Sequence, residues 1–105
     1  FSPVKLSVVH PGGIATNIVR NMRTGVAVTD NARRAEVIEY FDKEFAKTTA
    51  QAAATAIIAG IEKNAPRILI GGDARKLDWL QRILPGTYFR ILRRQIARRG
   101  GPRFF

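Results

Sequence analysis

Two short apolar runs, separated by a long stretch of helical character, most constrain how this chain can fold. Val4–Val9 is rich in β-branched residues, has polar residues at alternate positions, and is ended sharply by Pro11, Gly12 and Gly13. Arg67–Ile70 forms a second short apolar run, framed by a proline and a glycine pair. Parallel strands need a crossover of about a dozen or more residues, usually a helix. The order therefore predicts a βαβ unit with parallel strands and a right-handed connection.

The residues between the two runs show the apolar spacing of helices. Thr16–Thr29 is irregular and rich in helix breakers, which predicts a short helical turn followed by a loop. Ala32–Lys47 then carries Val37, Phe41 and Phe45 at helical intervals, with charged residues on the opposite face. The segment therefore predicts an amphipathic helix.

A second helix is expected to begin at Thr48, which forms a capping box with Gln51, and to end near Asn64. It is apolar on a surface too broad for a helix with one buried side, so we expect it to lie under other elements or to form an interface. Two further helices are predicted after the second strand. One has Gly71-Gly72-Asp73 as its cap and carries Leu77, Leu80 and Leu84, and the other covers Thr87–Arg99.

Composition narrows the function classes. The 105 residues fit one small domain or part of a larger one, and the absence of cysteine excludes a disulfide framework and a thiolate metal site. No apolar stretch has the length of a membrane span, and residues 1–6 lack the form of a secretory signal. The expected location is the cytoplasm, with peripheral membrane attachment as an open alternative. The formal charge is +10, and residues 75–105 hold nine of the 18 basic groups but one of the 8 acidic groups.

The chain resembles the C-terminal portion of the short-chain dehydrogenase/reductase family. The resemblance covers nearly the whole chain and rests on "VVHPGGIATNI", on "TTAQAAATAIIAGIEKNAPRILIGGDAR" and on a later "LPG". It implies an α/β fold in which the two strands are the last two of a Rossmann-type doubly wound parallel sheet, incomplete as a stand-alone fold. A two-stranded parallel sheet with open edges normally needs more strands, which agrees with this expectation. The implied parts are a strand and Pro-Gly turn over 1–15, a substrate-covering segment over 16–47, a helix and last strand over 48–72, and a basic helical C-terminus over 73–105.

The departures from the family pattern matter equally. A complete member carries a glycine-rich turn at its first strand for the cofactor diphosphate and a Tyr-x-x-x-Lys pair for proton transfer. Here Tyr40 is followed four places on by Glu44, and Tyr88 by Leu92. We therefore expect no catalytic residue in this chain, and no dehydrogenase activity from the chain alone. The resemblance implies a parent enzyme that transfers a hydride between NAD or NADP and an alcohol or carbonyl substrate.

The resemblance assigns cofactor contacts to the turn. Pro11 and Gly12 would let the backbone pass close to the nicotinamide, the main chain of Ile14 would bond the carboxamide, and the Thr16 hydroxyl would bond the carboxamide or a diphosphate oxygen. The plain alternative is a strand end that needs a turn. His10, the one histidine, has no nearby partner in sequence, so we expect it to be packed or hydrogen-bonded rather than a base.

Substrate contacts are expected just beyond the turn. Ile18, Val19 and Met22 could line an apolar substrate pocket or could equally belong to the core, because arginines beside them indicate a surface segment with one apolar side. No metal site is expected.

Two surfaces are candidate partner sites. The resemblance implies homo-oligomers through the 50–61 helix and the 67–70 strand, where small residues permit close approach. The basic residues 87–105 surround an apolar stripe of Tyr88, Leu92 and Ile96, a composition suited to an anionic membrane surface. The alternatives are a stripe packed on the body of the protein with solvated arginines, or a binding module for nucleic acid, which no RNA-binding signature supports.

Overall fold

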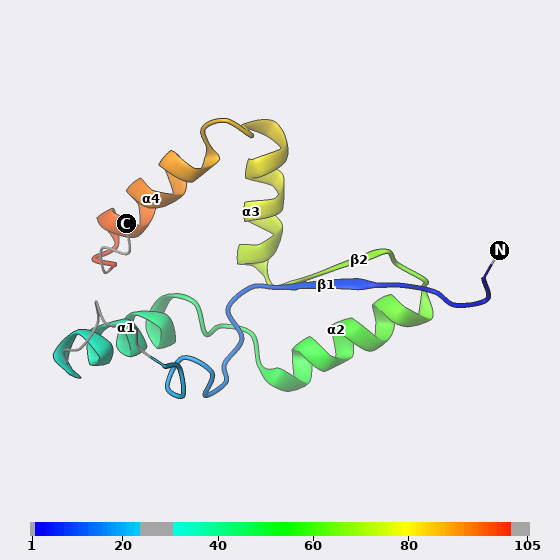
Figure 1. Cartoon of the computed structure of the whole chain (residues 1–105), viewed down its shortest axis with the longest axis horizontal. Helices are drawn as coiled ribbons and strands as arrows, with labels where there is room; N and C mark the ends of the chain where they lie inside the picture. Colours follow the sequence, from blue (N-terminus) through cyan, green and yellow to red (C-terminus); the bar gives the residue numbers. More distant parts are fainter. Residues whose placement is uncertain (1, 24–30, 102–105) are drawn as a thin grey trace.

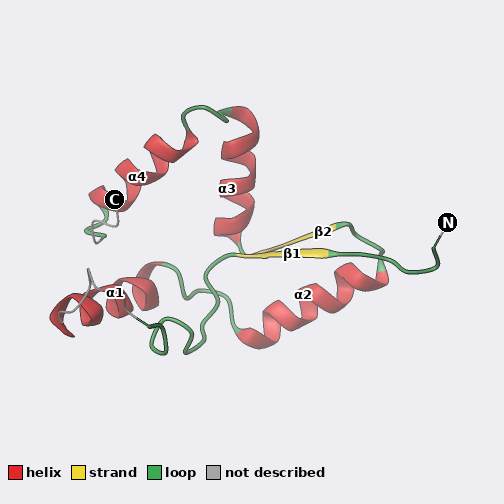
Figure 2. Cartoon of the chain, viewed as in Figure 1, coloured by secondary structure: helices red, strands yellow, loops and turns green. Residues whose placement is uncertain are grey.

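The computed structural model describes residues 2–23 and 31–101 of the chain. Gly25 and Asp30 of the predicted loop, and Phe104 and Phe105 of the tail, lie outside the described residues. The described part is an α/β arrangement of two strands and four helices (Figures 1 and 2). In chain order these are β1 (Val8–Pro11), α1 (Asn31–Glu44), α2 (Ala50–Glu62), β2 (Arg67–Ile70), α3 (Gly72–Ile83) and α4 (Tyr88–Arg98).

The two strands pair in parallel, as the order of elements predicts. Val8 lies opposite Arg67 and Pro11 opposite Ile70. The prediction for the first strand was wrong in its bounds, because β1 begins four residues later and includes Pro11. Its partner is only four residues long and follows a proline, so residues 4–6 have no strand to pair with, and the side chains of Val4 and Leu6 are 77% and 81% exposed.

The second helix is capped one residue later than the sequence predicts. Thr49 is the N-cap, and its hydroxyl accepts a hydrogen bond from the N–H of Ala52. Thr48 is used elsewhere, in an isolated parallel bridge with Ile14. In a capping box the third residue after the N-cap returns a side-chain bond to it, and after Thr49 that residue is Ala52. The capping box with Gln51 therefore does not form.

The core is small and lies between α2 and β2. Ala53, Ile68 and Ile70 are the buried apolar side chains of the described residues, with exposed fractions of 7%, 6% and 3%. A glycine at position 60 lets α2 approach closely, because a Cβ there would lie 2.5 Å from Cδ1 of Ile68. The opposite side of α2 stays open, since Ile58 is 57% exposed, as the breadth of its apolar surface suggests.

The remaining helices extend the molecule away from this core. Figure 1 shows α3 leaving the end of β2 and α4 turning back towards α1. An ion pair between Arg99 and Glu44, 3.4 Å apart, joins the end of α4 to the end of α1. The radius of gyration is 16.3 Å, against about 13 Å for a compact domain of about this length. Within the described part, no helix has both the length and the apolar character needed to cross a bilayer.

Candidate functional site

Two glycine-containing turns meet at one edge of the sheet. Because β1 and β2 are parallel and end in register at Pro11 and Ile70, the residues that follow each strand emerge side by side. This carboxyl edge is where open α/β sheets bind their ligands. Residues 11–16, called here the strand-end turn, therefore lie in the position where a ligand site is expected.

The backbone of the strand-end turn is tied to three other segments. The N–H of Gly12 donates to the carbonyl of Ile70 at 2.8 Å. The N–H of Gly13 donates to Oδ2 of Asp73 at 2.7 Å. Thr48 uses both of its backbone groups, since its N–H donates to the carbonyl of Gly13 at 3.5 Å and its carbonyl accepts from Ala15 at 2.8 Å. The turn is thus held by the end of β2, the start of α3 and the entry to α2.

One donor of this turn stays unused. Since Thr48 bonds to the residues on either side of Ile14, the backbone groups of Ile14 point away from Thr48. Its carbonyl accepts from the N–H of Thr16 at 2.8 Å, while its own N–H has no partner among residues 2–23 and 31–101. The Thr16 side chain is exposed and has no hydrogen-bond partner in that part either. The arrangement presents a fixed N–H donor and a free hydroxyl two residues apart.

The two glycines of the turn are sterically required. A Cβ on Gly13, which is buried, would lie 2.0 Å from the carbonyl oxygen of Phe45, and a Cβ on Gly12 would lie 2.0 Å from Oδ1 of Asp73. Glycine at position 12 therefore admits a carboxylate rather than giving only freedom of rotation. The sequence predicted Asp73 only as part of a helix cap, and gave no sign of its bond to Gly13.

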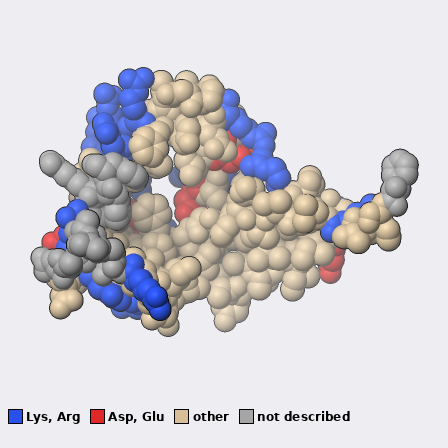
Figure 3. Space-filling model, viewed as in Figure 1, with Lys and Arg blue, Asp and Glu red and all other residues tan. Residues whose placement is uncertain are grey.

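A cavity of about 670 Å³ lies beside the turn and is lined by Pro11, Gly12 and Gly13, by Phe41 and Phe45, and by Leu77 and Leu92. A second cavity of about 470 Å³, between α1, α3 and α4, shares Phe45, Leu77 and Leu92 with it. The space-filling view shows the hollow between α1 and the α3–α4 pair, and Lys and Arg gathered on the outer side of α4 (Figure 3). The apolar residues near the turn thus come from the helices that follow it.

The residues predicted to contact substrate do not line either of these two cavities. Ile18 is 70% exposed, and Val19 and Met22 are half-buried in a short helical turn, in which the N–H of Met22 donates to the carbonyl of Val19 at 3.3 Å. The aromatic residues of α1 and the leucines of α3 and α4 take that place. Helical spacing predicted that Phe41, in α1, and Phe45, just after its end, share one face, but nothing in the sequence showed which element would face them.

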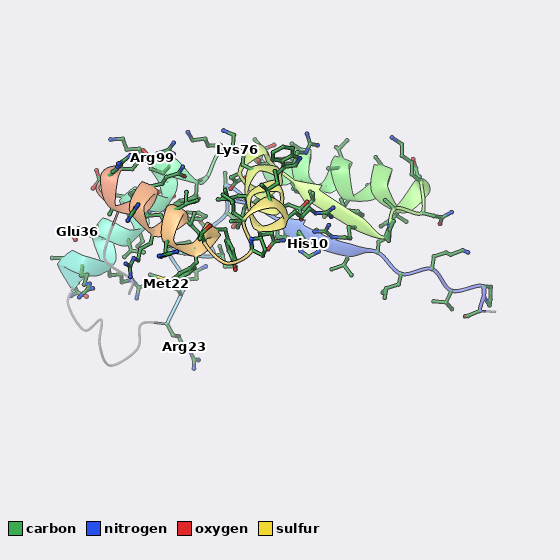
Figure 4. All side chains as sticks on the ribbon, turned by 90° about the horizontal axis from the view of Figure 1, so that it is seen from above. His10, Met22, Arg23, Glu36, Lys76 and Arg99 are labelled. Carbon is green, nitrogen blue, oxygen red and sulfur yellow. The ribbon has the colours of Figure 1, made fainter. Side chains whose placement is uncertain are left out.

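His10 and Tyr40 do not form a proton-transfer site. His10 is exposed on β1 beside α3, near the middle of the molecule, and Glu36 and Arg99 lie towards one end, away from it (Figure 4). The His10 side chain has no hydrogen bond to any of the described residues, so the expectation of a packed or hydrogen-bonded histidine was wrong. Burial raises the pKa of the Tyr40 phenol, Glu44 raises it further, and Arg99 partly offsets the rise. A catalytic tyrosine needs the opposite shift. The described residues contain no cluster of three or more groups that could hold a metal ion.

Comparison with known proteins adds one similarity. Over 96 residues, or 91% of this chain, the sequence is 34% identical to a protein named "Putative oxidoreductase SadH" from two strains of Mycobacterium tuberculosis. The match covers 33% of that protein, so the chain spans about a third of the length of the curated relatives it matches. No family model matches the chain. No solved structure matches it.

Proposed function

We propose that this chain is the C-terminal part of a short-chain dehydrogenase/reductase, and that its strand-end turn binds the nicotinamide end of NAD or NADP. The observation that carries the proposal is the N–H of Ile14, which has no partner in the described part of the chain, in a turn whose other N–H groups are all bonded. Supporting observations are the parallel strand pair and the similarity to the relative named as an oxidoreductase. The further strands of a Rossmann-type sheet would pair with the open edge of β1 and leave that of β2 unpaired.

The donor set suits a nicotinamide. A carboxamide needs a fixed donor and acceptor at one end of an apolar ring, and the main chain of Ile14 with the Thr16 hydroxyl would supply the polar contacts. Pro11 and Gly12 line the cavity beside the turn, where their backbone would lie close to a flat ring. The bound cofactor would exchange a hydride with an alcohol or carbonyl substrate, while the proton donor would come from residues outside this chain. The longer chain that carries those residues is called the parent below.

Removal of the free N–H tests the proposal. Ile14→Pro in the parent deletes this donor at no cost in hydrogen bonds among the described residues, whereas Ile14→Val keeps it. We expect Ile14→Pro to weaken binding of NADH or NADPH about tenfold or more, in titration calorimetry, and Ile14→Val to leave it nearly unchanged. Far-ultraviolet circular dichroism checks that both variants fold. Equal affinity in the folded proline variant, or no dinucleotide binding by the parent, would reject the proposal.

The proposal extends to self-association through α2 and β2. Ile58 and Ile61 are 57% and 56% exposed on the outer side of α2, and β2 has an unpaired edge. Apolar side chains beside an open strand edge favour pairing with a second copy. We expect Ile58→Asp with Ile61→Asp to convert the parent to a smaller species in light scattering, while Gly86→Asp, at an open position outside α2 and β2, serves as a charge control. A parent that is monomeric at micromolar concentration would contradict this extension.

A further inference from the structure

The carboxylate of Asp73 serves the strand-end turn rather than its own helix. Asp73 lies in the first turn of α3, where an acidic side chain normally interacts with the N-terminal N–H groups of the same helix. The N-cap of α3 is instead Gly71, with no side-chain cap bond, and Oδ2 of Asp73 accepts from the N–H of Gly13, sixty positions earlier. A side chain from the second turn thus fixes the backbone of the first.

Two glycines make room for this carboxylate. A Cβ on Gly12 would lie 2.0 Å from Oδ1 of Asp73, and a Cβ on Gly71 would lie 2.6 Å from the same oxygen. Gly71 also has φ of 91°, a conformation that favours glycine. The Pro-Gly-Gly and Gly-Gly-Asp sequences, which look like independent turns, are therefore two halves of one structure around a single carboxylate.

Asp73 and Thr48 together hold the residue that precedes the free donor. The N–H of Ile14 shares its planar peptide unit with the Gly13 carbonyl, so the bond from the N–H of Thr48 to that carbonyl sets its direction. Asp73 holds the preceding peptide unit through the N–H of Gly13, and so restrains the glycine rotations that would otherwise move the Ile14 unit. Among the contacts of this turn, the bond from Asp73 is the one made by a side chain, so substitution can remove it alone.

We propose that Asp73 is a positioning residue for the cofactor: it holds the N–H of Gly13 while Thr48 holds the Gly13 carbonyl, so that the N–H of Ile14 faces the nicotinamide carboxamide. The inference rests on the proposed function. It assigns Asp73 a role in binding without contact with the cofactor, and it makes cofactor affinity depend on the start of α3. A residue that served only as a helix cap would affect stability alone.

Three substitutions in the parent separate these roles. Asp73→Ala removes the acceptor, Asp73→Asn keeps a carbonyl oxygen that can accept from Gly13, and Asp78→Asn changes another carboxylate of α3, which bonds to Arg67 and Arg82. In calorimetric titrations with NADH and NADPH, we expect Asp73→Ala to weaken binding about tenfold. The asparagine variant should retain most of the affinity, and Asp78→Asn all of it. Unchanged affinity in Asp73→Ala, with a parent that binds dinucleotide, would overturn the proposal and leave the proposed function intact.

The contact between Gly12 and Asp73 offers a second test. Gly12→Ala should weaken dinucleotide binding strongly in the parent, because the new methyl group would overlap the carboxylate. In the Asp73→Ala background that overlap is gone, so the same substitution should cost several-fold less affinity. Equal losses in both backgrounds would overturn the proposed packing of the carboxylate on Gly12.

Amide exchange keeps the proposal testable without a cofactor. In the glycine-labelled parent, the Gly13 amide proton should exchange slowly, and at least tenfold faster in Asp73→Ala, while Gly12, bonded to the end of β2, should change less. If the parent binds neither dinucleotide, the proposed function fails and the cofactor role of Asp73 fails with it. Unchanged exchange at Gly13 would refute the hydrogen bond between Gly13 and Asp73 itself, so the two failures are distinguishable.

Discussion

Thr16 contributes to the strand-end turn a single exposed hydroxyl, so its removal should affect binding and little else. In the parent, Thr16→Val should weaken dinucleotide binding by about 0.5–1.5 kcal/mol, or somewhat more if the partner is a charged diphosphate oxygen. Titration calorimetry measures the change. Thr55→Val is the matched control, because the Thr55 hydroxyl donates to the carbonyl of Gln51 on α2, away from the turn. An unchanged dissociation constant would remove Thr16 from the site.

The Asp78 carboxylate, which is paired with Arg67 and Arg82, makes the stability of the fold depend on pH. The hydrogen bond from Arg67, 2.6 Å away, and then the charges of Arg67 and Arg82 hold the pKa of this carboxyl below its ordinary value of 3.8. A carboxyl with a lowered folded-state pKa stabilises the fold above its unfolded pKa and loses that contribution as pH falls through the folded pKa.

The difference in stability between the parent and the Asp78→Asn variant should therefore become smaller in acid. The urea midpoints of the two proteins should differ most near pH 7 and less at pH 3, because a protonated aspartate resembles asparagine. Added salt should reduce the difference at pH 7, since the ion pairs with Arg67 and Arg82 are at the surface. A difference that grows towards pH 3 would show that another group is responsible.

At the scale of elements, the packing of α2 on β2 depends on Gly60 of α2, which lies against Ile68 of β2. Gly60→Ala should destabilise the protein because its Cβ would overlap Ile68, which is nearly buried. Ile68→Ala alone should cost about 2 kcal/mol or more through lost burial. Combined, the two substitutions should cost less than their sum, since the new methyl group occupies the space that Ile68 leaves. Thermal unfolding of the two single variants and the double variant measures this difference.

Gly86→Ala is the control for this packing prediction, because a Cβ at position 86 would meet no atom within 4 Å. It should leave the unfolding midpoint almost unchanged. Strictly additive effects of Gly60→Ala and Ile68→Ala would show that the contact between α2 and β2 differs from the one described here.

The apolar stripe of α4 faces inward. Leu92 and Ile96 line the cavity between α1, α3 and α4, and both are only half-exposed. This placement favours packing on the body of the protein over insertion into a membrane. We therefore expect parent proteins with and without the residues after Pro85 to be retained equally on vesicles of anionic lipid in sedimentation, and the truncated form to unfold at lower temperature. Salt-sensitive retention of the untruncated parent alone would support the membrane alternative.

At the scale of the whole molecule, the described part buries few apolar side chains. Its three buried apolar side chains, open strand edges and extended shape contrast with what a domain of this length normally encloses. We expect the 105-residue chain alone to unfold over a broad temperature range and to show no nicotinamide turnover with a panel of alcohols and ketones. A sharp cooperative transition, or turnover above a buffer control, would contradict this.

Much of the fold was predictable because it depends on local patterns. The strand at Arg67–Ile70, the parallel βαβ order and the approximate helix positions follow from apolar spacing and from glycine and proline. The bounds that were wrong are those set by a partner distant in sequence. Thr48 does not cap α2 because it pairs with Ile14, and β1 is displaced because pairing ends where β2 ends.

The sequence by itself determined that a glycine turn follows the first strand and that aromatic residues share one face of α1, since both follow from properties of neighbouring residues. Only the tertiary structure decided that Asp73 reaches Gly13 and that the leucines of α3 and α4, rather than Ile18, lie beside the turn. These contacts join segments about sixty or more positions apart. Their formation depends on how the strands pair and where the helices leave the sheet, which no local pattern of residues encodes.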